Sequence, residues 1–138
     1  MIKGVGHVAI VVKDIKESLH FYCDIMGFKM VRKFTQPWKG GGNVYDLTMD
    51  NTQLGEVQLI EYVKPAPCGK YVSNSEITGV QHVGILIEDM DATYAYLKSK
   101  GVNTFVEEPK PPKPGSPRVA RLLDPNGVVL ELITFVNR

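Results

Sequence analysis

The chain has 138 residues, of which 43% are hydrophobic and 22% are charged, and its formal net charge at pH 7 is +1. This length predicts a single domain, 1–138, whose core needs no disulfide or other covalent support. The ordinary composition argues against a disordered or membrane-embedded chain. The near-neutral charge, without a long basic run, argues against nucleic acid as a partner.

The expected location is the cytoplasm. The sequence shows no signal-peptide pattern and no apolar run long enough to cross a bilayer, so no membrane association is expected. The two cysteines, Cys23 and Cys68, are expected to be free thiols, as in proteins of reducing compartments.

The chain opens with a strand-and-helix pattern at 4–15, GVGHVAIVVKDI, which recurs 75 residues later at 79–90 as GVQHVGILIEDM. Because successive side chains of a strand point to opposite faces, each copy separates an apolar stripe from a face that carries a histidine. The alignment pairs equivalent residues in the two copies: His7 with His82, and Asp14 with Asp89.

A helix is predicted after each opening strand. Asp14, with Glu17 three residues later, resembles a capping box, and Gly27 suits the left-handed conformation that ends a helix. Asp91 and Gly101 are expected to bracket the second helix in the same way.

Three strands are predicted to follow each helix. They lie at about 28–36, 43–50 and 55–63 in the first half, and at about 103–108, 117–124 and 127–136 in the second. The prediction is therefore an α+β fold of two tandem β-α-β-β-β modules, at about 1–63 and 79–138, joined by a linker at 64–78. The five prolines of 109–117 exclude helix or central strand there.

The closing strands of the two halves, VQLIEYV and LELITFV, place Gln58 and Glu131 at equivalent positions. Divalent transition metals are commonly held by imidazole nitrogens together with carboxylate or amide oxygens, with open positions left for substrate. Strand alternation allows both histidines, Gln58 and Glu131 to face one cavity. Buried polar groups cost free energy unless they are paired, so packing alone does not explain this repetition. We predict a site for one divalent ion, Zn, Ni, Co, Mn or Fe, with the ligands His7, Gln58, His82 and Glu131.

Other polar residues of the strands are candidates for chemistry. Glu56 shares a face with Gln58 and lies roughly 6–7 Å along the strand, so it is a candidate base. Glu61 points to the other face and is interpreted as a surface or dimer-contact carboxylate. Asp46 either faces the cavity or faces solvent, because the register of its strand is not fixed by the sequence.

Arg121 is a candidate for binding an anionic group of a substrate. If the turn around Asp124-Pro125-Asn126-Gly127 leaves three residues in the loop, Arg121 lies opposite Glu131; with two residues, Ala120 does. Burying an unpaired guanidinium under a helix is costly, which favours the first register and a bidentate grip on an anion. The alternative is an arginine that extends to solvent at the sheet edge.

Two aromatic residues, Trp38 and Tyr45, are candidates for the wall of a substrate pocket. Aromatic residues at such positions serve equally often in packing, so both interpretations remain open.

These residues together resemble the vicinal oxygen chelate superfamily, which includes glyoxalase I, methylmalonyl-CoA epimerase, extradiol dioxygenases and bleomycin-resistance proteins. The resemblance rests on the paired GVxHV openings, the QLIEY and LELI closings and LLDPNG before the last strand, and it covers nearly the whole chain. It implies two βαβββ modules that curl an open sheet around a metal cavity, a small-molecule substrate and a homodimer.

The resemblance also implies roles for individual residues. The family's metal ligands fall on His7, Gln58, His82 and Glu131, a set most similar to that of methylmalonyl-CoA epimerase. In glyoxalase-type chemistry the last-strand glutamate can also act as base, here Glu131. The epimerases carry a glutamate ahead of the third strand, whereas QPWKGGGNVYD has none, which argues against an epimerase.

Three functions follow from this resemblance. The leading hypothesis is a metal-dependent lyase or isomerase, in which a metal that chelates two substrate oxygens eases removal of a proton beside a carbonyl. The second is an iron dioxygenase that uses His7, His82 and Glu131 as a facial triad. The third is a metal-free protein that sequesters a small molecule.

Overall fold

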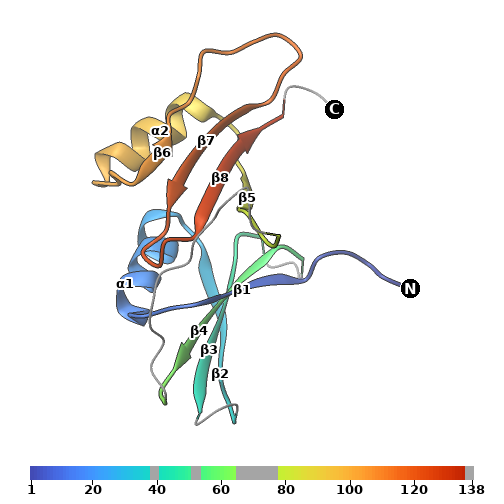
Figure 1. Ribbon diagram of the computed structural model, residues 1–138, viewed down its shortest axis with the longest axis vertical. Helices are drawn as coiled ribbons and strands as arrows, with labels where there is room; N and C mark the ends of the chain where they lie inside the picture. The colour runs from blue at the N-terminus through green and yellow to red at the C-terminus, as the bar shows by residue number, and fades with distance from the viewer. Residues whose placement is uncertain (38–40, 51–53, 65–77, 136–138) are drawn as a thin grey trace. The chain divides into compact units, whose positions relative to one another are not determined.

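The computed structural model describes residues 1–37, 41–50, 54–64 and 78–135. It divides into two compact units, Met1–Lys70 and Tyr71–Arg138. Each unit carries one four-stranded sheet and follows the order β-α-β-β-β, so the predicted α+β fold is confirmed (Figure 1). The grouping of both units into a single domain stays a prediction.

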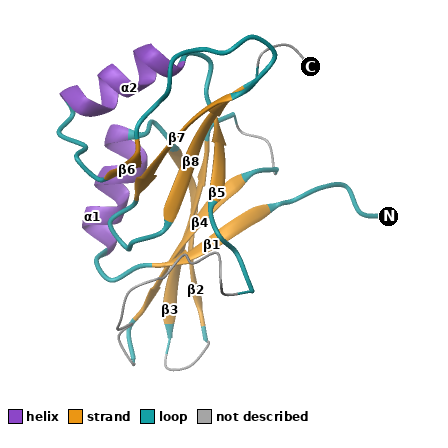
Figure 2. Ribbon diagram, turned by 45° about the horizontal axis from the view of Figure 1, so that its top comes forward, coloured by secondary structure: helices purple, strands orange, loops and turns teal. Residues whose placement is uncertain are grey.

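The first unit contains β1 (His7–Val11), α1 (Ile15–Leu19), a π-helical turn η1 (His20–Ile25), and the strands β2 (Lys29–Gln36), β3 (Gly42–Thr48) and β4 (Glu56–Tyr62). The order across its sheet is β1-β4-β3-β2, so β1 and β2 form the two edges (Figure 2). The pair β1 and β4 is parallel, and the other pairs are antiparallel.

The second unit contains β5 (Val83–Leu86), α2 (Met90–Ser99), β6 (Phe105–Glu107), β7 (Arg118–Leu123) and β8 (Val129–Thr134). Its order across the sheet, β5-β8-β7-β6, repeats that of the first unit, with β5 parallel to β8. All six predicted strands that follow the helices are present, although β6 and β8 are shorter than expected.

One face of each sheet is apolar, as the alternation in the sequence predicts. In the first unit Ile10 and Leu59 lie side by side on this face, and α1 contacts β4. In the second, Leu122 and Leu130 are paired and fully buried, and α2 contacts β8. This burial supplies the main driving force for folding in each unit.

Equivalent aspartates begin the two helices. The Asp14 carboxylate accepts hydrogen bonds from the backbone N–H of Lys16 (2.8 Å) and of Glu17 (3.2 Å). The Asp89 carboxylate accepts one from Ala92 N–H (2.8 Å) and caps α2. The expected start of the second helix at Asp91 is therefore wrong by two residues: Asp91 lies in the first turn instead.

The first helix differs from the second by the π-turn η1, which the sequence pattern does not predict. Gly27 follows its capping aspartate by 13 positions, whereas Gly101 follows Asp89 by 12. Both glycines have positive φ, +87° and +82°, and end their helices. A π-turn accommodates one additional residue within a helix. The turn η1 thus absorbs the length difference between the two copies.

Arg118 joins three parts of the second unit. Its guanidinium donates two 2.8 Å hydrogen bonds to the carboxylate of Asp91 in α2 and one of 3.0 Å to the carbonyl of Lys110 in the proline-rich loop. The hydrogen bond from Arg118 lowers the pKa of Asp91. The proline-rich segment is loop, as predicted, and this arginine ties it to the helix.

Among the described residues, none of the helices combines the length and apolar character that a membrane span requires.

Candidate functional site

A row of three polar side chains crosses the first sheet on the face opposite its apolar face. Neighbouring strands place Arg32 beside Asp46, and Asp46 beside Gln58. Asp46 is 1% exposed, and each of its carboxylate oxygens has a partner: Oδ2 accepts from Arg32 Nε (2.6 Å) and Oδ1 accepts from Gln58 Nε2 (2.9 Å). We call Arg32, Asp46 and Gln58 the first row. Asp46 therefore faces the same side as Gln58, which the sequence left open.

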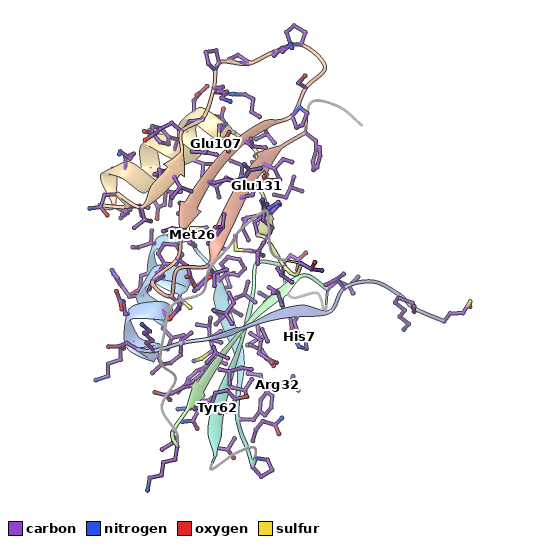
Figure 3. All side chains as sticks on the ribbon, viewed as in Figure 1. His7, Met26, Arg32, Tyr62, Glu107 and Glu131 are labelled. Atoms are coloured by element: carbon purple, nitrogen blue, oxygen red, sulfur yellow. The ribbon has the colours of Figure 1, made fainter. Side chains whose placement is uncertain are left out.

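The second sheet carries an equivalent row at the same register positions. Glu107 lies beside Arg121, and Arg121 lies beside Glu131. The guanidinium of Arg121 donates from Nη1 to Glu107 Oε2 (2.6 Å), and from Nε (2.9 Å) and Nη2 (2.5 Å) to Glu131 Oε2. We call these three residues the second row. Figure 3 labels Glu107 and Glu131 from this row and Arg32 from the first.

The turn that sets the second row is the one expected from the sequence. The backbone N–H of Asp124 donates to the carbonyl of Val128 (2.9 Å), which leaves three residues in the loop. The Asp124 carboxylate accepts from the N–H groups of Asn126 and Val128 and so rigidifies the turn. The prediction that Arg121 lies opposite Glu131 is confirmed. Its guanidinium, assigned above to a substrate anion, is held by two carboxylates of the chain itself.

His82 lies next to the second row. Its Nε2 is 3.5 Å from Glu131 Oε1, the carboxylate oxygen that Arg121 does not contact. On the other side of the ring, Nδ1 lies 2.5 Å from Gln81 Oε1. An amide oxygen only accepts, so Nδ1 is the donor in this contact, and Nε2 is the ring nitrogen that faces Glu131. An imidazole nitrogen and a carboxylate oxygen are thus brought together.

His7 lies at the start of β1, directly beside Glu56 in the parallel pair. Both side chains are on the face of the first row, and Gln58 lies two residues farther along β4. Glu56 makes no side-chain hydrogen bond or ion pair with the described residues. The second unit has an apolar residue, Val129, at the equivalent position of β8, so this carboxylate is particular to the first unit.

Small residues stand beside the two closing-strand candidates. Ala9 is the β1 neighbour of Gln58, and Gly84 is the β5 neighbour of Glu131. A Cβ added at Gly84 would meet no atom within 4 Å. The position beside Glu131 is therefore open at Gly84.

Of the two candidate pocket residues, only Tyr45 lies within the described part of the chain. The register pairs Tyr45 with Leu59, which places it on the apolar face, opposite to Gln58. There its hydroxyl donates to Glu61 (3.4 Å), which also accepts from Asn43 (3.1 Å). Tyr45 thus serves packing in this unit. Trp38 lies outside the described residues, as does Cys68.

Each unit carries donor atoms of the kinds that bind divalent ions. His82 Nε2 and Glu131 Oε1 are adjacent, and the Gln58 amide nitrogen is bound by Asp46, which leaves the amide oxygen for another partner. Nitrogen and oxygen donors of this kind suit first-row transition metals. Within 1–37, 41–50, 54–64 and 78–135, no group of three or more His, Cys, Asp or Glu side chains forms a ready-made metal cluster.

The sequence matches a known family over residues 4–132, that of the Glyoxalase/Bleomycin resistance protein/Dioxygenase superfamily. The chain belongs to this superfamily. Both copies of the strand-and-helix opening and both rows of this superfamily member fall within the matched range.

Individual relatives cover the superfamily member almost from end to end. A probable lactoylglutathione lyase of Synechocystis is 32% identical over 92% of both chains. An uncharacterized Escherichia coli protein, YaeR, is 31% identical over 95% of both. The crystal structure of a glyoxalase family protein from Enterococcus faecalis superposes with a TM-score of 0.75 at 24% identity, covering 95% of this chain and 97% of that one, and so supports the fold.

Proposed function

We propose that this superfamily member is a metal-dependent lyase or isomerase of the glyoxalase type, acting on a small substrate with a carbonyl group. The proposed ligands of one divalent ion are His7, Gln58, His82 and Glu131. The observation that carries the proposal is the pair formed by His82 Nε2 and Glu131 Oε1, 3.5 Å apart. The lactoylglutathione lyase relative supports the reaction class.

A bound divalent ion would supply a Lewis acid that makes a hydrogen beside a carbonyl easier to remove. The chain itself has to supply ligands, a base and orientation. His82 offers Nε2 because Gln81 engages Nδ1, and Glu131 offers Oε1 because Arg121 engages Oε2.

Two carboxylates are candidates for the base, Glu131 and Glu56. Glu131 would have to use the oxygen that faces His82 or else break its hydrogen bonds to Arg121. Glu56 has no side-chain partner among the described residues and lies beside His7. These contacts support Glu56 as the proton acceptor and Glu131 as a ligand.

Hydrogen exchange in deuterated water, without oxygen, tests the reaction. Enzyme loaded with its native metal should exchange the hydrogen beside the carbonyl of a bound 2-oxo- or 2-hydroxy-carbonyl substrate. Glu56→Gln should reduce the rate by about two to four orders of magnitude, the usual contribution of a general base. The matched control is Glu61→Gln, a carboxylate on the same strand that points to the other face.

Other results would change the assignment. If exchange survives in Glu56→Gln and is lost in Glu131→Gln without loss of bound metal, Glu131 is the base. Activity that requires dioxygen and iron would replace the proposal with a dioxygenase. Protein purified without added metal that neither contains nor binds a divalent ion would favour a sequestering protein.

We also propose that the chain works as a homodimer. The support is the family resemblance together with the exposed side chains of the edge strand β1, Ala9 and Val11. Analytical ultracentrifugation at micromolar concentration should show a dimer, and a monomer throughout would overturn this part of the proposal.

A further inference from the structure

The two rows occupy the same positions in the two sheets, but their charges are exchanged. The middle position is an aspartate in the first row and an arginine in the second; the outer position is Arg32 in one and Glu107 in the other. In the first row the inner residue is the amide Gln58, and its neighbour is the carboxylate of Asp46. In the second row the inner residue is the carboxylate Glu131, and its neighbour is the guanidinium of Arg121. Each middle residue is therefore matched to the hydrogen-bonding groups of the inner residue.

In the first row this match fixes the direction of the amide. A carboxylate can only accept hydrogen bonds, and Asp46 is buried with Arg32 on its other oxygen. The amide nitrogen of Gln58 must therefore turn toward Asp46, and the amide oxygen is left as the outward atom. Metals bind amides through oxygen, so this is the orientation that a ligand needs.

In the second row the middle residue, Arg121, fixes the direction of a carboxylate. A guanidinium can only donate, and two of its N–H groups bind a single oxygen of Glu131, Oε2. The other oxygen, Oε1, is left toward His82 Nε2. Arg121 thereby selects one carboxylate oxygen and fixes its direction.

We propose that Asp46 and Arg121 are positioning residues that decide which atom Gln58 and Glu131 present as ligands. The inference rests on the proposed metal site. It implies that the amide at 58 and the carboxylate at 131 are not interchangeable, because each depends on the residue beside it on the neighbouring strand. Asp46 makes residue 58 an amide-oxygen ligand, and Arg121 makes residue 131 a carboxylate ligand.

A double-mutant cycle in the first row tests this. In Asp46→Asn, Arg32 would still donate to the oxygen of residue 46, so the new amide group would face Gln58. Gln58 would then turn its oxygen inward and its nitrogen outward, which should weaken Zn²⁺ binding about 10- to 100-fold, the usual effect of losing a residue that orients a ligand. Gln58→Glu alone should also weaken binding, because it places two carboxylates in contact.

The double variant, Asp46→Asn with Gln58→Glu, should regain at least about tenfold of the lost affinity. Its new amide group can donate to one oxygen of the glutamate and leave the other oxygen outward. Calorimetric titration with Zn²⁺ measures all four proteins, and thermal unfolding checks that each is folded. The matched control is Glu61→Gln, a carboxylate on the other face of β4 and outside both rows, which should leave the affinity unchanged. A double variant as weak as the worse single variant would overturn the inference.

A readout in the metal-free protein separates this inference from the proposed function. NMR of the wild-type protein should show the side-chain amide hydrogens of Gln58 exchanging slowly with water, because Asp46 holds them. Asp46→Asn should make them exchange at least about tenfold faster. If the wild-type protein binds no metal but shows this protection, the metal site is wrong and the positioning is right. If Zn²⁺ binds but the amide exchanges freely in the wild-type protein, the positioning is wrong.

Discussion

The two units share one order of strands but are stabilised by different contacts. The helical connection of the first unit is aromatic: Tyr22 is fully buried and packs edge-on against Phe21 and Phe28, with ring centroids 5.1 and 6.0 Å apart. The helix of the second unit is tied to its sheet and loop by the charges of Arg118 and Asp91. The second helix also has an aromatic contact, between Tyr94 and Phe105 (4.9 Å between ring centroids), so the ion pair at the surface is what this repeat adds.

Some features of the repeat are common to both units and others are not. Both units keep the alternation that gives each sheet an apolar and a polar face, and both keep the capping aspartates and the glycines that end the helices. The contacts that fasten the helix differ. The two units should therefore respond alike to changes in the proposed ligands and differently to changes in their helices.

The largest expected effect is on metal binding, and it should be shared by both units. His7→Ala and His82→Ala should each abolish tight binding of a divalent ion, with losses beyond about 100-fold, the upper end for residues that only orient a ligand. Calorimetry with Zn²⁺ measures the loss. In the wild-type protein, affinity should also fall in acid, because only neutral imidazole binds metal. Loss in one variant alone would confine the site to one unit.

The next largest effect concerns the cores. Tyr22→Ala removes a fully buried aromatic ring and should cost about 3–5 kcal/mol of stability, whereas Leu97→Ala in α2 should cost about 2–5 kcal/mol. Urea unfolding monitored by circular dichroism measures both. A loss from Tyr22→Ala well below its expected range would show that the aromatic cluster is not the main support of the first unit.

A deletion should distinguish the two helices. Removing Asp24 from η1 would leave 12 positions between the capping aspartate and Gly27, the spacing found in the second unit, so an ordinary α-helix should form at a cost of about 1 kcal/mol or less. Removing Ala95 from α2 would rotate Leu97 off the buried face and should cost about 2–5 kcal/mol. Equal losses in thermal unfolding would contradict the role given to the π-turn.

The smallest expected effect is the pH dependence of the Arg118–Asp91 pair. Its hydrogen bonds lower the pKa of Asp91, so the pair stabilises the fold above the ordinary aspartate pKa of about 3.9 and loses this effect as the pH falls through the lowered value. Asp91→Asn should therefore be less stable than the wild-type protein at neutral pH, and the difference should disappear in acid and shrink at high salt. Glu88→Gln, at an exposed carboxylate ahead of α2, is the control. A difference that persists at pH 2 would exclude this cause.

Much of the fold follows from local sequence signals. Alternation predicts the apolar face that contains Ile10 and Leu59, and the cost of burying an unpaired guanidinium favours the turn in which Arg121 lies opposite Glu131. The start of α2 was missed because Asp89 and Asp91 both have the chemistry of a helix cap. The repeat decides between them, since Asp14 aligns with Asp89.

The site was harder to predict where it depends on pairing between strands. Asp46 could not be assigned a face from the sequence, because the register shift between Met30 and Arg32 and the pairing with β4 are set by tertiary structure. One partner of Arg121 has the same origin: Glu107 meets it only across the pairing of β6 with β7. The placement of Tyr45 on the apolar face also depends on this register.

The π-turn shows where the length of the first helix can change during evolution. It lies between a capping aspartate and a glycine that both occupy the same structural positions as in the other repeat. A codon gained or lost in this stretch alters only the winding of one helical turn. The register of the strands that carry His7 and Gln58 does not change. The length of this helix can therefore vary without altering the polar residues of the sheet.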